Sequence, residues 1–203
     1  EMLLAIAHDA ARMLTVPERV GLLGNVSALL DAGAIHGDEM LKLLPAFASD
    51  PDPAVVDSVL TGLGTIKASF VTEDLEEPFA RYVQSTLRPA LDRFGMSRTE
   101  GEPVTVTSLR PRILQWLGEE GRDEKVLAFA DKLAKSYRDD PTSVDASLVE
   151  TAIFLSARRA DRALFDDYAH QSRTYERAAL VAPTLAARML STALAGTDEA
   201  QDR

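Results

Sequence analysis

The sequence contains no cysteine, which excludes a disulfide framework, a thiol nucleophile and any zinc or iron–sulfur site with cysteine ligands. Aromatic residues make up only 6% of its 203 residues, and alanine and leucine recur throughout. This balance favours close packing of helices over a β-sandwich, whose strands are rich in branched and aromatic side chains. The length and the 46% share of hydrophobic residues indicate one or at most two compact domains.

Basic residues are scarce as well. The 22 lysines and arginines stand against 32 acidic residues, for a formal net charge of -10. A nucleic-acid-binding protein needs a basic surface to neutralise phosphates, so we expect no nucleic-acid partner and no attraction to anionic membranes. The acidity is concentrated in residues 1–108, whose 16 acidic and 8 basic residues give a net charge of -8.

Long apolar runs are also missing. None approaches the roughly 20 residues that span a bilayer, and no signal-peptide pattern is present, so we expect no membrane segment. The chain begins with Glu1 instead of methionine, and we therefore expect a processed product or a piece of a longer protein. The bacterial cytoplasm is the compartment that we expect, although no residue pattern identifies it.

Apolar residues at three- and four-residue spacing, with helix-cap residues at the breaks, predict an all-α protein. Thr15 and Glu18 have the spacing of a capping box, Asp52 before Pro53 is typical of a helix start, and Asp38 is expected to cap another helix. Ten or eleven helices are expected. The third begins at Asp38, and Pro45 either kinks it or ends its regular part; the last is split or kinked at Pro183. The other ranges are about 2–14, 15–32, 53–69, 72–94, 108–119, 123–137, 143–158, 161–172 and, for the last helix, 174–195.

The polar loop 96–107 is the expected hinge between two subdomains, 1–95 and 108–203, of a single helical domain. Within it, Val104–Thr107 shows the one strand-like alternation of the chain. Short connections imply antiparallel helix pairs, which can close into a bundle or stack as a solenoid. No strict repeat of 33 to 45 residues is present, but a HEAT/ARM-like α-solenoid, whose units vary in length, is favoured over a closed bundle.

The sequence lacks the H-E-x-x-H motif with which a zinc hydrolase places two imidazoles and a carboxylate base on one helix face. Its three histidines, His8, His36 and His170, are far apart. The best constellation is Asp166, Asp167 and His170, whose spacing puts them on one helix surface. A solvated acidic face is favoured there over a metal site, because such groupings are common on exposed helices.

Several other residues favour a structural role over a chemical one. Asp50 and Asp52 each precede a proline. This context favours roles in a turn and a helix cap over roles as a catalytic acid and base. Gly62 and Gly64 lie in an apolar helical stretch and predict a close contact between helices. Trp116 continues an apolar helical stripe, where core packing is favoured over a platform for a ligand.

The densest basic cluster consists of Arg158, Arg159 and Arg162, just after a helix that is expected to end near Leu155–Ala157. Cations near a helix C-terminus interact favourably with its last carbonyl groups, and this reading is favoured. The alternative is that the guanidinium groups capture the carboxylate of a peptide.

In their order, several segments resemble the C-terminal helical domain of the aminopeptidase N type of zinc metallopeptidase, the family that includes the endoplasmic-reticulum aminopeptidases. The resemblance covers most of the chain, although no single motif is specific. Two positions depart from the family pattern: Asn25 stands where aspartate is usual, and Arg122 is inserted before Asp123. The matching segments are Glu18-Arg19-Val20-Gly21-Leu22-Leu23, Ala32-Gly33, Asp50–Val55, Leu109-Arg110, Ile113-Leu114, Leu117, Gly121, Val126, Ala130, Leu148-Val149, Phe165-Asp166, Thr174 and Glu176-Arg177.

The resemblance implies a HEAT-like array that packs over the catalytic domain of the same polypeptide, covers its active site and controls the access of peptide substrates. The zinc ligands and the substrate-binding motif of the family belong to that other domain. The resemblance thus implies no catalytic residue, metal ligand or cofactor in this chain. A stand-alone helical-repeat scaffold that binds proteins is the alternative.

The family's helical domain is usually longer, so the resemblance also implies that the array is truncated at Arg203. A solenoid that is cut within its array lacks a polar terminal cap. We expect self-association through an exposed apolar stripe that includes Leu185, Met189, Leu190 and Leu194.

Overall fold

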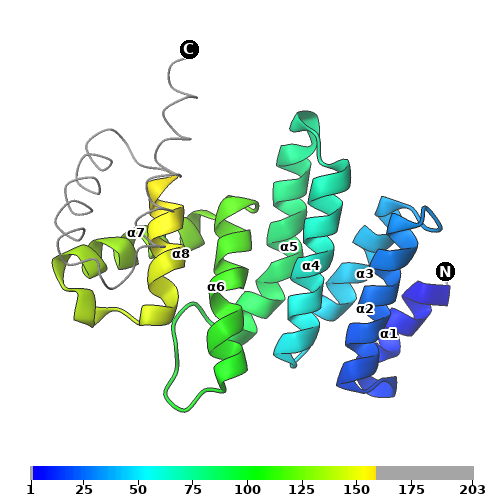
Figure 1. Ribbon diagram of the computed structural model, residues 1–203, viewed down its shortest axis with the longest axis horizontal. Helices are drawn as coiled ribbons and strands as arrows, with labels where there is room; N and C mark the ends of the chain where they lie inside the picture. Colours follow the sequence, from blue (N-terminus) through cyan, green and yellow to red (C-terminus); the bar gives the residue numbers. More distant parts are fainter. Residues whose placement is uncertain (1, 159–203) are drawn as a thin grey trace. The chain divides into compact units, whose positions relative to one another are not determined.

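The computed structural model describes residues 2–158, which form eight α-helices and two short 3-10 helices with no strand among them (Figure 1). The prediction of an all-α protein is confirmed. The expected helices at 161–172 and 174–195, and the apolar stripe at 185–194, lie outside these residues. The elements are α1 (Met2–Met13), α2 (Val16–Asp31), α3 (Gly37–Ala48), α4 (Pro53–Phe70), η1 (Glu73–Leu75), α5 (Glu76–Phe94), α6 (Val104–Glu119), α7 (Glu124–Asp139), η2 (Pro141–Ser143) and α8 (Ala146–Ala157).

The chain divides into two compact units, Glu1–Asp123 and Glu124–Arg203. This division differs from the expected boundary in loop 96–107, which lies inside the first unit. The reason is that α6 packs against α4 and α5, and that Glu102 within the loop is ion-paired to Arg110 of α6.

Helices of the first unit alternate between two layers. In one layer α4 contacts α2 and α6, and in the other α3 contacts α1 and α5 (Figure 1). Consecutive helices join the layers, because α3 packs on α4 and α5 packs on α6. Two ion pairs, Lys67 with Glu120 and Arg112 with Asp57, link α4 to the α6 end of the unit. This arrangement of residues 2–123 is compatible with the solenoid that the sequence predicts.

Helix α4 supplies the centre of the first unit's core. Burial of each branched aliphatic side chain stabilises the fold by about 1.5–3 kcal/mol. Gly62 lets α3 approach closely, since a Cβ atom placed there would lie 2.7 Å from Cε of Met40 and 2.9 Å from Cδ2 of Leu44. The predicted helix contact at Gly62 is thus confirmed. The buried side chains of α4 are Val55, Val56, Val59, Leu60, Leu63 and Ile66.

Two of the predicted helix starts are confirmed. The backbone N–H of Thr15 donates to Oε2 of Glu18 at 2.7 Å, and the backbone N–H of Ala54 donates to Oδ1 of Asp52 at 2.9 Å. Each bond satisfies a polar group at a helix start.

Two other local predictions are wrong. His36, and not Asp38, caps α3, because Glu39 accepts the backbone N–H of His36 at 2.9 Å, while Asp38 pairs with Lys42. The expected loop 96–107 is too long, because α6 begins at Val104 and not at Ser108, and the strand-like residues Val104–Thr107 form its first turn. Their alternation is too short to compete with the helical spacing of the buried residues that follow them.

Pro45 lies inside α3, which continues to Ala48. Proline has no N–H, so the carbonyl of Leu41, four residues earlier, loses its partner within the helix. Tyr82 of α5 supplies the missing donor: its hydroxyl donates to the Leu41 carbonyl oxygen at 2.6 Å. A side chain of α5 thereby compensates for the missing hydrogen bond in α3.

In the described part of the second unit, α7 packs on α8. The side chain of Asp145 caps α8 by accepting the backbone N–H of Ser147 at 2.8 Å. The core of this helix pair consists of the buried residues Ala134, Val149, Ala152 and Ile153, with Leu133, Tyr137 and Val144 packed against them.

Candidate functional site

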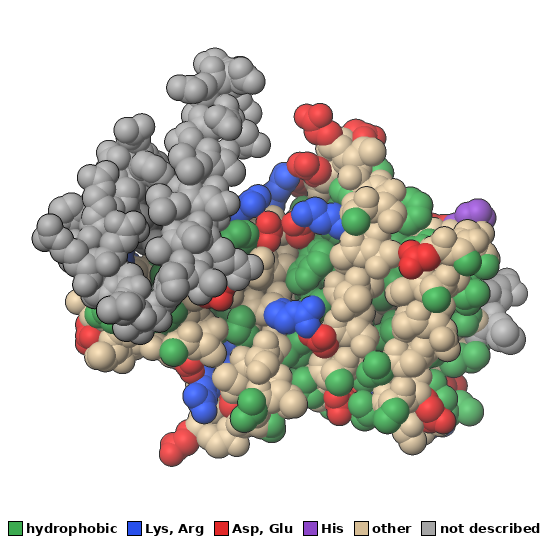
Figure 2. Space-filling model, viewed as in Figure 1, with side chains coloured by type: hydrophobic (Ala, Val, Ile, Leu, Met, Phe, Trp, Pro, Cys, Tyr) green, Lys and Arg blue, Asp and Glu red, His purple; other side chains and the backbone are tan. Residues whose placement is uncertain are grey.

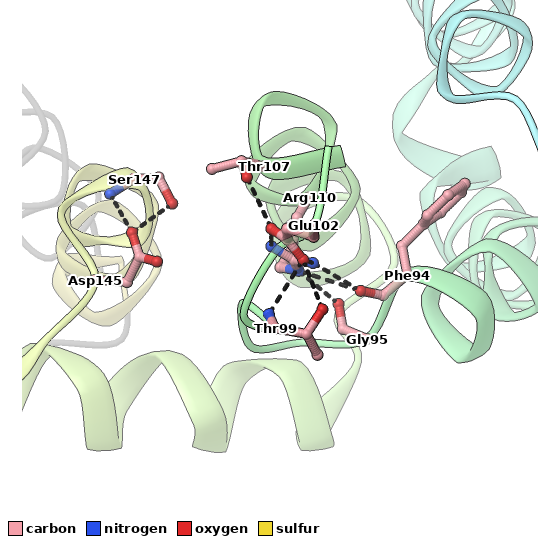
Figure 3. A network of polar contacts seen from close by, with 8 residues as sticks. All are labelled: Phe94, Gly95, Thr99, Glu102, Thr107, Arg110, Asp145 and Ser147. Carbon is pink, nitrogen blue, oxygen red and sulfur yellow. Dashed lines mark hydrogen bonds and ion pairs between the residues drawn. The ribbon is translucent and has the colours of Figure 1, made fainter. Parts of the chain in front are cut away.

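The most deeply buried polar group in the described residues is Arg110, near the middle of α6, which is 1% exposed. Its guanidinium binds the Glu102 carboxylate with two bonds, Nη1 to Oε1 at 2.7 Å and Nη2 to Oε2 at 2.5 Å (Figure 3). Nη2 also donates to the Phe94 carbonyl at 2.9 Å, and Nε donates to the Gly95 carbonyl at 3.1 Å. Arg110 therefore fastens the loop after α5 to α6.

Glu102 accepts three further hydrogen bonds, from Oγ1 of Thr107 at 2.8 Å and from the backbone N–H and Oγ1 of Thr99, each at 3.2 Å. The bonds from Arg110, followed by those from Thr107 and Thr99, hold the pKa of Glu102 far below its ordinary value, although burial opposes them. The carboxylate therefore stays ionised at neutral pH. A group in this state does not serve as a general acid, and its contacts with Arg110 hold the loop on α6.

A second buried ion pair joins Arg19 of α2 to Asp50 in the connection between α3 and α4. Nε of Arg19 lies 2.8 Å from Oδ2 of Asp50, and Nη1 donates to the Leu14 carbonyl at 2.6 Å. Asp50 also accepts the backbone N–H of Asp52 at 2.9 Å, which is the turn chemistry predicted for it. The Arg19–Asp50 pair therefore links the connection between α1 and α2 to the connection between α3 and α4.

Arg19 and Arg110 make the same kinds of contact at two different connections between helices. Each reaches a carbonyl group at the end of the preceding helix and pairs with a buried carboxylate. Both belong to segments that carry the family resemblance, Glu18-Arg19 and Leu109-Arg110. The sequence did signal these positions, but only as parts of a motif. Their burial depends on partners that no local pattern identifies.

The turn that ends the first unit, Glu120–Asp123, is held by contacts with α5. Nε2 of Gln84 donates to the Gly121 carbonyl at 2.5 Å, and Arg88 pairs with Asp123, whose side chain is 5% exposed. The inserted Arg122 has a φ of 50°, in the left-handed region that favours glycine.

The Arg122 guanidinium lies over the start of α5, with Nη2 2.7 Å from Oε2 of Glu76 and Nη1 3.5 Å from Oε2 of Glu77. A left-handed conformation costs an L-residue about 1–2 kcal/mol. Exposed ion pairs such as these contribute about 0.2–1 kcal/mol each. The free-energy cost of the left-handed backbone and the stabilisation from the ion pairs are therefore of similar size.

The predicted basic cluster is only partly within the described residues. Arg158 follows α8 directly, and its guanidinium carbon lies 5.8 Å from the centroid of the Phe154 ring. This geometry is a cation–π contact. Arg159 and Arg162 lie outside the described residues, so capture of a peptide carboxylate by this cluster stays a prediction. Asp166, Asp167 and His170 also lie outside them, and the solvated acidic face expected there stays a prediction too.

Residues 2–158 contain no group of three or more histidine and acidic side chains arranged to hold a metal ion. Within the same range, no helix is both long and apolar enough to cross a membrane. The face in Figure 2 shows acidic side chains gathered at the connection between α4 and α5, with basic side chains beside acidic ones. The ionisable residues that we describe above mainly hold the connections between helices.

These features define an all-helical protein in which paired helices are joined by connections fixed through buried arginine–carboxylate pairs. The sequence matches the family described as "ERAP1-like C-terminal domain" over residues 1–200, and the chain belongs to this family. Aminopeptidase 2 of Candida albicans (strain SC5314 / ATCC MYA-2876) is 22% identical over 157 residues, which cover 76% of this chain and 17% of that protein. The chain thus spans only a small part of the length of this relative.

Proposed function

We propose that the chain is the non-catalytic C-terminal helical domain of a zinc-dependent aminopeptidase, where it covers the active site and controls which peptides enter. The observation that carries this proposal is the family match over residues 1–200. The relationship to a much longer protein named as an aminopeptidase supports it further. The proposal assigns the zinc and the catalytic residues to another domain of the same polypeptide.

The geometry supports an accessory role in a second way. Glu102 and Asp50, the buried carboxylates of the first unit with arginine partners, are both engaged by guanidinium groups and by backbone N–H groups. Such contacts fix the connections of a helical scaffold, and both carboxylates are taken up by them. A scaffold of paired helices presents broad surfaces, which is what covering a substrate chamber requires.

The experiment compares the complete gene product with a version that lacks this chain. Both are assayed with an aminoacyl anilide, which needs only the catalytic site, and with peptides of increasing length that share one N-terminal residue. We expect the deletion to leave anilide hydrolysis largely intact and to abolish the dependence of kcat/KM on peptide length. An unchanged length dependence would contradict the control of peptide access.

The same preparations test the assignment of the metal. Metal analysis after dialysis should find zinc in the complete product and none in the 203-residue chain, which should be inactive toward the anilide. Stoichiometric metal in the chain, or turnover that a chelator abolishes, would overturn the non-catalytic assignment. A complete gene product without zinc or peptidase activity would instead favour the stand-alone scaffold.

A further inference from the structure

Arg122 combines a strained backbone with exposed ion pairs, at the point where the first unit ends. Its left-handed φ of 50° is the one positive φ of a non-glycine residue within the described range. Its partners Glu76 and Glu77 belong to the first turn of α5 and are more than half exposed, as is Arg122 itself. An exposed pair is screened by salt, whereas the cost of the backbone conformation is not.

The contacts on either side of Arg122 are of a different kind. The Asp123 carboxylate that Arg88 binds is buried, and Gln84 holds the Gly121 carbonyl. These contacts keep the ends of the turn on the first unit when the outer pairs open. Opening is therefore confined to the backbone of residues 121–123, which lies between these contacts.

We propose that Arg122, Glu76 and Glu77 form an ionic latch, which holds the turn Glu120–Asp123 in its strained conformation and opens when the ionic strength rises. The latch is a conformational device of the first unit and does not depend on the proposed function. When it is closed, the backbone N–H of Gly121 donates to Trp116 and that of Asp123 donates to Leu117, each at 2.9 Å. These two N–H groups report the state of the latch.

The test is hydrogen exchange of the Gly121 and Asp123 amides in the purified protein, at about 0.01 M and about 1 M NaCl, between which the Debye length falls from about 30 Å to about 3 Å. We expect exchange in the wild type to rise by up to about fivefold at high salt, the factor that corresponds to the strongest exposed pairs. The Glu76→Gln/Glu77→Gln variant should exchange fast at both salt concentrations.

The matched control is Glu73→Gln/Asp74→Asn, which removes the same charge from η1, next to α5, without touching Arg122. It should behave as the wild type does, since a general effect of charge on exchange would change both variants alike. A second variant, Arg122→Gly, accepts the left-handed φ without strain and should lose the salt dependence. Three results would each overturn the proposal. They are equal exchange in the two double variants, exchange in the wild type that does not depend on salt, and a salt dependence that persists in Arg122→Gly.

Discussion

Single residues with partners distant in the sequence hold the connections of the first unit in place, and Arg110 makes the largest number of such contacts that we describe. Arg110→Met leaves Glu102 as an uncompensated charge that is only 5% exposed. We expect the free energy of unfolding to fall by about 3–5 kcal/mol, as for other buried pairs that lose one partner. Urea denaturation measures this loss.

The control for Arg110 is Arg81→Met, because the exposed i,i+4 pair of Arg81 with Glu77 contributes about 0.3–0.5 kcal/mol. The double variant Arg110→Met/Glu102→Leu should recover much of the loss, since it removes both charges. A loss for Arg110→Met as small as that of Arg81→Met would contradict the structural role of the pair.

Glu102 should also make the free energy of unfolding decrease as the pH falls into the acid range. Its pKa is lowered on folding, so the unfolded chain binds more protons than the folded chain near and below the ordinary carboxyl pKa. The stabilisation is therefore fully present above about pH 4.5 and is lost as the pH falls below it. Urea denaturation at each pH should give a difference in unfolding free energy between wild type and Glu102→Gln that is constant from about pH 6 to about pH 8 and shrinks toward acid pH. A difference that grows toward acid pH would reverse the assigned sign.

At the scale of the element, helix α3 depends on a contact that compensates for its internal proline. The Tyr82 hydroxyl replaces the N–H that Pro45 lacks, and burial raises the pKa of Tyr82 to about 12, so the hydroxyl remains a donor at neutral pH. We expect Tyr82→Phe to cost about 1 kcal/mol, the lower end of the range for leaving an acceptor unsatisfied, because this hydrogen bond is only partly buried.

Denaturant unfolding of Tyr82→Phe in the Pro45→Ala background completes a double-mutant cycle for this contact. The substituted alanine has an N–H that can bond to the Leu41 carbonyl, so the loss of the Tyr82 hydroxyl should cost less there. An equal cost in both backgrounds would contradict the compensation.

Helices were predictable from the sequence where the signal is local. The capping box at Thr15 and the cap at Asp52 involve residues two or three apart, and both were predicted. The cap at His36 was missed because histidine is an unusual cap residue, and only the Glu39 carboxylate identifies it. Glu102 with Arg110 and Asp50 with Arg19 were missed as pairs, because contacts between separate helices and connections leave no periodic pattern in the sequence.

At the scale of the whole molecule, the uneven charge leads to a prediction about substrates that rests on the proposed function. Residues 1–108 carry a net charge of -8. If part of that surface lines the chamber of the complete enzyme, low-dielectric walls focus its negative potential on an entering peptide. Basic peptides should then be favoured over acidic ones, and the preference should weaken as salt shortens the Debye length.

The measurement is kcat/KM of the complete enzyme for matched peptides that share one N-terminal residue and carry Lys or Glu tails. It is made at about 0.01 M and about 0.1 M salt, where the Debye lengths are about 30 Å and about 10 Å. We expect the Lys-tailed peptide to be favoured, and more so at the lower salt. The deletion version without this chain is the control, because a preference that arises in the catalytic domain persists there. Equal values for the two tails, or a preference indifferent to salt, would mean that the acidic surface faces outward and serves solubility.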